Sequence, residues 1–61
     1  MTFTLTELRE CAEREAKIRR RVYANRIETG RMSQREADRQ IAMMDEIAER
    51  LRQFEQADLL I

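Results

Sequence analysis

The chain contains one glycine and no proline, and the glycine, Gly30, stands at the midpoint of the 61 residues. Glycine readily takes the left-handed backbone conformation that ends many helices, and a run without glycine or proline can remain helical throughout. Each of the two segments that Gly30 separates begins with a helix-start signal. The sequence therefore predicts two long helices joined by one sharp turn.

The two start signals contain the same two kinds of residue pair. Each contains a pair typical of a capping box, in which two residues cap each other's backbone amides: Thr4 with Glu7, and Ser33 with Glu36. Each also contains an apolar pair typical of a hydrophobic staple: Phe3 with Leu8, and Met32 with Ala37. We predict helix one over about 5–29, the turn over about 30–33 and helix two over about 34–58, all within a single domain spanning 1–61.

The short chain limits what can stabilise this hairpin. Below about 70 to 80 residues, a lone core seldom suffices without disulfides, metal or oligomerisation. Cys11 is the only cysteine and histidine is absent, so neither an internal disulfide nor a usual zinc site can form. We expect no metal and no cofactor, and we expect a second copy of the chain to supply the missing burial.

The expected apolar surface supports this view, because it is wider than one partner helix can cover. On a helical wheel the apolar arcs span about 160° on helix two and nearly 180° on helix one, whereas one partner covers about 100°. Four residues of helix two follow the alternating 3,4 spacing of a coiled-coil core: Met44, Ile47, Leu51 and Phe54. We predict an all-α fold, a coiled-coil-like two-helix antiparallel hairpin that dimerises into a four-helix bundle.

Several polar groups invite a chemical interpretation that the sequence does not favour. Cys11 falls on the apolar edge of helix one, and a thiol nucleophile would lack a histidine base, so we predict that it packs in the core. The acids Asp45, Glu46 and Glu49 lie on the solvated side of helix two. We therefore expect no enzyme and no catalytic residue.

Basic residues gather around the predicted turn. Residues 17–35 contain seven basic residues and one acidic residue, a net charge of +6 in a chain that is neutral as a whole. In a hairpin this stretch forms the tip and its adjoining stem. The candidate partner-binding residues are Arg20, Arg21, Tyr23, Arg26, Arg31 and Arg35.

Three charged residues, Glu15, Arg19 and Arg26, interrupt the apolar arc of helix one. Glu15 and Arg19 have the favourable i, i+4 order for an ion pair. The simpler interpretation is that the long arginines lie along the bundle edge with their guanidinium groups in water or against an acid. Alternatively, Arg26 forms a ligand-facing patch near the turn together with Asn25 and Tyr23.

Residues 21–44 resemble the central part of a group of short uncharacterised proteins found in bacterial genomes and in phages or prophages. The shared elements are a Val-Tyr pair at 22–23, a Gly-Arg-Met-Ser turn at 30–33, an Ala-Asp pair at 37–38, and the spaced Ile41 and Met44. The resemblance implies a mobile-element origin. It implies no established activity, cofactor or catalytic residue.

These observations predict a non-enzymatic, cytoplasmic protein that binds another macromolecule. The N-terminus has neither a basic leader nor a continuous apolar stretch, and the apolar runs are too short to span a bilayer, so we expect no signal peptide and no membrane partner. The expected partners are a second copy and an unknown host or phage protein, for which the chain is a small accessory or inhibitor.

Two alternatives stay open. The arginines of the tip could attract nucleic-acid phosphates, although one tyrosine offers little stacking surface. The apolar tail Leu59, Leu60 and Ile61 could instead dock the chain into a larger assembly.

Overall fold

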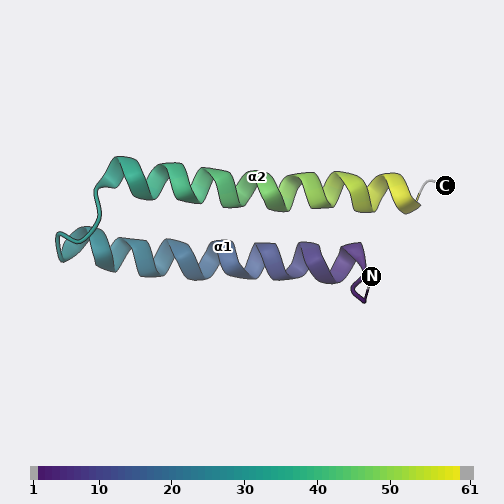
Figure 1. Cartoon of the computed structure of the whole chain (residues 1–61), viewed down its shortest axis with the longest axis horizontal. Coiled ribbons are helices and arrows are strands. Elements are labelled where there is room, and N and C mark those ends of the chain that lie inside the picture. Colours follow the sequence, from purple (N-terminus) through teal and green to yellow (C-terminus); the bar gives the residue numbers. More distant parts are fainter. Residues whose placement is uncertain (1, 60–61) are drawn as a thin grey trace.

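The computed structural model describes residues 2–59 and consists of two helices, α1 (Leu5–Glu28) and α2 (Gln34–Leu59). The helices lie side by side and antiparallel, with the turn at one end and the start of α1 and the end of α2 at the other (Figure 1). The hairpin measures 48 × 19 × 15 Å. The predicted all-helical hairpin is confirmed, and each helix ends within one residue of its predicted C-terminus.

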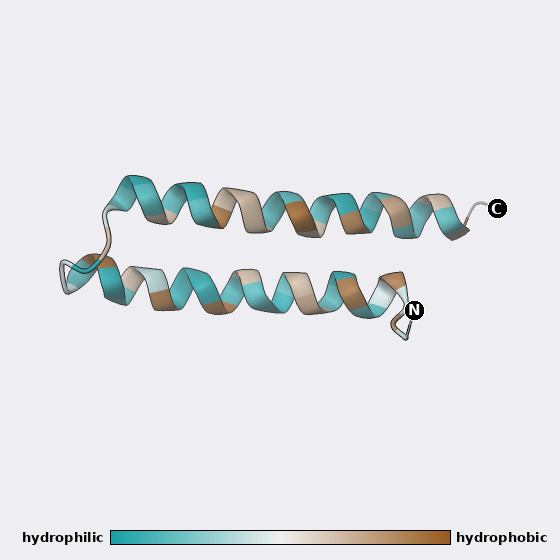
Figure 2. Ribbon diagram, in the orientation of Figure 1, coloured by the Kyte–Doolittle hydropathy of each residue, from teal (hydrophilic) through white to brown (hydrophobic). Residues whose placement is uncertain are grey.

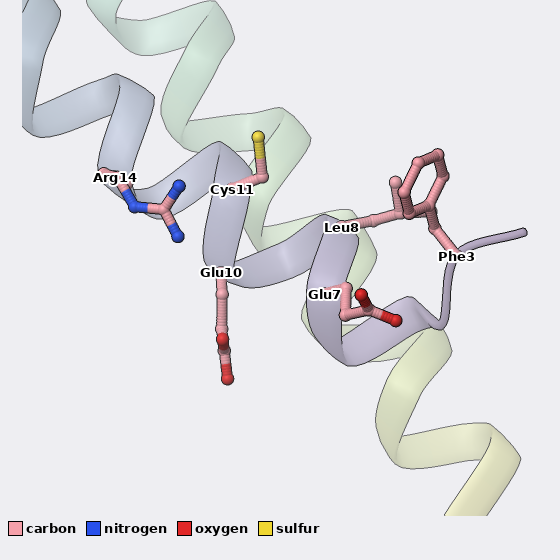
Figure 3. A pocket seen from close by; sticks show the side chains of 6 residues that line it. All are labelled: Phe3, Glu7, Leu8, Glu10, Cys11 and Arg14. Carbon is pink, nitrogen blue, oxygen red and sulfur yellow. The ribbon is translucent and has the colours of Figure 1, made fainter.

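The capping box at the start of α1 is complete. The Glu7 amide donates to the Thr4 hydroxyl at 3.1 Å, and the Thr4 amide donates to Glu7 Oε1 at 3.1 Å. Leu8 points toward the ring of Phe3, as a hydrophobic staple requires (Figure 3). The predicted start signal of the first helix is therefore confirmed.

Only half of the second capping box is formed. The Glu36 amide donates to the Ser33 hydroxyl at 3.1 Å, and the Ala37 amide donates to the Ser33 carbonyl at 3.0 Å. Among the hydrogen bonds of residues 2–59, none returns from the Ser33 amide to the Glu36 carboxylate. Ser33 alone caps α2, so the prediction of a reciprocal box is wrong in that respect.

Gly30 ends α1 in a Schellman motif. Its φ is +76°, in the left-handed region. The Gly30 amide donates to the Ile27 carbonyl at 3.1 Å, and the Arg31 amide donates to the Arg26 carbonyl at 2.8 Å. These are the two hydrogen bonds that define the motif. The one glycine of the chain therefore reverses the chain direction and leaves these two carbonyls satisfied.

We expect Gly30→Ala to lower the free energy of unfolding by about 1–2 kcal/mol, because a side chain in the left-handed region is strained. An added Cβ would meet no atom within 4 Å, so the whole effect comes from the backbone. Urea unfolding measures it. Gly30→Asn is the matched control, since asparagine tolerates this conformation, and an equal loss in both variants would contradict the explanation.

Small residues line the seam between the helices. Within residues 2–59 the buried residues are Ala12, Ala16, Ala37 and Met44. Ala48 and Leu51 pack against the cluster of Ala12, Ala16 and Met44. Hydrophobic segments recur along both helices with hydrophilic ones between them (Figure 2). Alanine allows two helix backbones to approach closely but buries little apolar area. The interior of one hairpin is therefore small.

Within the single hairpin, the predicted core register of α2 is wrong for two of its four residues. Met44 and Leu51 lie in the seam, but Ile47 is 50% exposed and Phe54 is 63% exposed. The seam instead follows the 3,4 spacing through Ala37, Ile41, Met44, Ala48 and Leu51. Facing alanines let the helices pack along this stripe, which leaves the larger side chains on its flank.

Cys11 is exposed, so the prediction that it packs in the core is wrong for the single hairpin. It lies three residues after Leu8 on α1, and both side chains line one hollow near the chain ends. In Figure 3, Cys11 and Glu10 point to opposite sides of the helix. The thiol belongs to the flank of the seam.

Candidate functional site

Ion pairs between the helices define one face of the hairpin. Arg20 of α1 binds Asp45 of α2 with 2.5 Å between Nη2 and Oδ2, and Arg52 of α2 lies 3.5 Å from Glu13 of α1. Both pairs cross the seam on the same side, because Glu13 and Arg20 lie on one flank of α1. We call this side the charged face.

Large apolar side chains lie on the opposite side of the seam. On α1, the flank opposite the two ion pairs between the helices carries apolar residues at helical spacing: Leu8, Cys11, Ile18 and Val22. On α2, Met43, Ile47 and Phe54 do the same. Apart from Cys11, which is also exposed, these residues are between 36 and 63% exposed. We call these seven residues the apolar face.

The apolar face contains one internal ion pair. Arg19 Nε lies 3.2 Å from Glu15 Oε1, which confirms the predicted i, i+4 pair. Both residues are partly exposed, so the guanidinium and carboxylate partly neutralise each other while still reaching water. The centre of this face therefore has no net charge.

At the open end of the hairpin, Arg9 connects the two helices. Its Nε lies 2.5 Å from Glu55 Oε2 of α2, and its Nη1 lies 3.1 Å from Glu13 Oε1 of α1. Hydrogen bonds to Glu55 and then Glu13 raise the pKa of Arg9 above its ordinary value. The hydrogen bond from Arg9 lowers the pKa of Glu13 below its ordinary 4.5. Both shifts favour the charged forms in the folded hairpin.

We expect the contribution of Glu13 to depend on pH. Because its folded-state pKa is lowered, its stabilising effect is present above pH 4.5 and is lost as the pH falls through the folded-state pKa. The difference in free energy of unfolding between the native chain and Glu13→Gln should therefore shrink in acid. Chemical unfolding between about pH 2.5 and 7 measures it.

The control for this measurement is the same pair of chains carrying Arg9→Gln. Removing the guanidinium removes the first cause of the shift, so the pH dependence of the Glu13→Gln effect should flatten. An unchanged pH dependence in the Arg9→Gln background would contradict the assignment.

The six candidate residues of the tip fall into different environments. Arg20 is held by Asp45, and the guanidinium carbon of Arg26 lies 5.9 Å from the centroid of the half-buried Tyr23 ring. Within residues 2–59, no acidic side chain forms an ion pair with Arg21, Arg31 or Arg35. The tip therefore combines engaged and unengaged arginines.

Three of these arginines share one surface hollow of about 400 Å³. It is lined by Arg21, Arg26 and Arg31 with Val22, Asn25 and Thr29. Arg20 and Tyr23 line a separate hollow on the side of Ala37 and Ile41, and Arg35 lines neither. We use the name arginine tip for Arg21, Arg26, Arg31 and Arg35.

The hollow contains Asn25, which the sequence placed in a patch with Arg26, but Tyr23 of that patch lines the other hollow. The sequence did not indicate Thr29, and its position four residues after Asn25, at the C-cap of α1, was the available signal. The Thr29 hydroxyl is already used, since it donates to the Asn25 carbonyl at 3.0 Å.

No group of three or more acidic or cysteine side chains that could hold a metal ion occurs within residues 2–59. Neither of the two helices is long and apolar enough to cross a membrane. Comparisons with protein-family models, with curated proteins and with solved structures give no match. The resemblance to short phage and bacterial proteins therefore stays a prediction, and the function must be argued from these surfaces.

Proposed function

We propose that the chain is a non-enzymatic binding protein that acts as a homodimeric four-helix bundle in the cytoplasm. The observation that carries this proposal is the apolar face, six of whose large side chains are at least one-third exposed. A contiguous exposed apolar surface on a small protein marks a place of protein contact. The sequence contains no histidine, so the one thiol has no imidazole base to activate it, which supports a binding role over catalysis.

Sedimentation equilibrium over a range of micromolar concentrations tests the dimer. The expected mass is twice the 7.4 kDa of the chain, together with full helicity by circular dichroism. A well-folded species with the mass of one chain, melting cooperatively at these concentrations, would remove the apolar face as an interface.

The arginine tip is the proposed contact for the further partner, a protein of the host or phage to which this chain is an accessory or inhibitor. Unengaged arginines around one hollow suit acidic side chains, because a guanidinium can bind a carboxylate with two parallel hydrogen bonds. Arg20 is a weaker candidate, since binding there must displace Asp45.

A pull-down from host lysate tests this contact with three baits. They are the native chain, a variant carrying Arg21→Gln, Arg26→Gln and Arg31→Gln, and a control carrying Arg14→Gln and Arg50→Gln, which are exposed away from the tip. A partner held by the native and control baits and lost by the tip variant supports the proposal. A partner retained equally by all three baits contradicts it.

Nucleic acid is the second candidate partner, and the unengaged Arg21, Arg31 and Arg35 favour it. Phosphate contacts make binding weaken steeply with salt. Tyr23 is half-buried beside Arg26, so it offers little open ring for base stacking. Titration of labelled duplex and single strands at low and physiological salt checks this candidate, and no salt-sensitive binding at low salt would eliminate it.

Docking into a larger assembly through the tail is the third candidate. Leu59 is 78% exposed at the end of α2, and Leu60 and Ile61 lie outside the described residues. Deletion of residues 59–61 tests this role. Unchanged assembly and solubility after the deletion would count against it.

A further inference from the structure

We infer that a second copy covers the apolar face in an antiparallel sense, with the arginine tip of each hairpin beside the open end of its partner. This inference rests on the proposed dimer and adds its geometry. Two identical hairpins can meet face to face about a two-fold axis in two ways. Either the two tips lie at the same end of the bundle, or they lie at opposite ends, and both arrangements cover the apolar face.

The distribution of charge distinguishes the two arrangements. Division at the helix midpoints gives a tip half, residues 17–46, with eight basic and five acidic residues, a net charge of +3. The other half, residues 2–16 and 47–59, has four basic and seven acidic residues, a net charge of −3. Tips at the same end bring like halves together, whereas tips at opposite ends bring each positive half beside a negative one.

Charges at the two ends of the apolar face favour the same choice. Arg26 follows Val22 by one helical turn at the tip end, and Asp58 follows Phe54 by one turn at the open end. With tips at opposite ends, Arg26 of one copy and Asp58 of the other lie at the same end of the interface. With tips together, each of these residues instead shares its end with its own like-charged copy.

The same charges explain why the occupant is a second copy. The apolar face runs from the positive tip half of the hairpin to the negative open half, and their net charges, +3 and −3, are equal and opposite. A surface that complements it therefore carries negative charge beside the tip and positive charge beside the open end. An inverted copy of the hairpin supplies that order and an equally long apolar stripe. Near the middle of the apolar face, Glu15 and Arg19 neutralise each other. Two identical faces can therefore meet there without opposing like charges.

The distance between two spin labels tests the arrangement. Glu28 is exposed at the tip end of α1, so a nitroxide at Glu28→Cys in a Cys11→Ser background reports the position of the tip. With the two tips at opposite ends of the bundle, the two nitroxides should lie about 36 Å or more apart, because α1 alone spans that length at 1.5 Å per residue. Tips together predict less than about 25 Å, since packed helices lie about 8–10 Å apart.

A second label at Ala57→Cys, exposed near the open end of α2, provides an independent measurement. Long separations at both positions support the antiparallel sense, and short separations at both overturn it. An equal mixture of long and short separations also overturns it, because one arrangement would not dominate. If the Cys11→Ser chain does not sediment as the native chain does, Cys11→Ala replaces it as the background.

Sedimentation of the labelled chains separates this inference from the proposed function. A monomer with no measurable dipolar coupling overturns the dimer, and the arrangement with it. A stable dimer with short label separations keeps the proposed dimer and overturns only the antiparallel sense. The salt dependence gives a second criterion, since the antiparallel dimer should dissociate more readily as salt screens the opposite halves, and the other arrangement less readily.

Discussion

Ile47→Glu is expected to separate the proposed dimer into monomers at micromolar concentration. Ile47 is half-exposed in the hairpin and lies in the middle of the apolar face, so an ionised carboxylate there would be buried without a partner. A buried uncompensated charge costs about 2–3 kcal/mol, and two-fold symmetry places it in the interface twice. Dimerisation should therefore weaken by at least about 10³-fold.

Sedimentation and circular dichroism over a range of concentrations measure this effect. Gln53→Glu is the matched control, because it introduces the same charge into the same helix at an exposed position away from the apolar face. The control should remain dimeric and helical. Equal behaviour of the two variants, or an intact dimer with Ile47→Glu, would contradict the assignment of this face.

Ala16→Leu is expected to destabilise the hairpin by about 1–3 kcal/mol. Ala16 is 4% exposed in the seam, packed in the cluster with Met44 and Ala48, so three added carbon atoms must push the helices apart. A change of this size corresponds to a fall of about 4–8 °C in Tm for each kcal/mol. Thermal melting at a fixed chain concentration measures it.

The matched control for the seam is Ala42→Leu, which makes the same change at an exposed position of α2. Its Tm should stay close to that of the native chain, since leucine and alanine have similar helix propensities. A rise in Tm with Ala16→Leu would show that the seam has room for a larger side chain, contrary to the packing described above.

The hairpin itself was predictable because its signals are local. The Thr4 and Ser33 caps and the left-handed Gly30 depend on contacts between residues within a few positions of one another. Glu36 does not form the return bond that Glu7 forms, although both carboxylates are exposed, so the residue pair alone does not decide whether the box closes. Local chemistry thus determined where each helix begins and ends.

The rotation of α2 about its own axis was not predictable from the same information. One stripe contains Met44, Ile47, Leu51 and Phe54, and the neighbouring stripe contains Ala37, Ile41 and Ala48, so both have the spacing of a core. The total apolar area favours the first stripe inside a hairpin. The close approach of helix backbones that alanine permits favours the second stripe. Only the packing of α1 against α2 shows that the second stripe forms the seam.

The environment of the candidate partner-binding residues depends on that rotation as well. Arg20 meets Asp45 because both lie on the charged face, 25 residues apart in the chain. The sequence correctly placed Arg21, Arg26 and Arg31 near the turn, since Gly30 fixes that end of the molecule. It did not show which arginines would have acidic neighbours.

The alanine seam has a consequence for the lifetime of the protein in the cell. A hairpin whose interior consists mainly of methyl groups opens often when it is alone, and proteases cleave the open form. If the proposed dimer forms, it depletes that open form by mass action, so the fraction cleaved falls as synthesis increases. Small changes in expression would then be amplified into larger changes in the amount of intact protein, without any dedicated degradation signal.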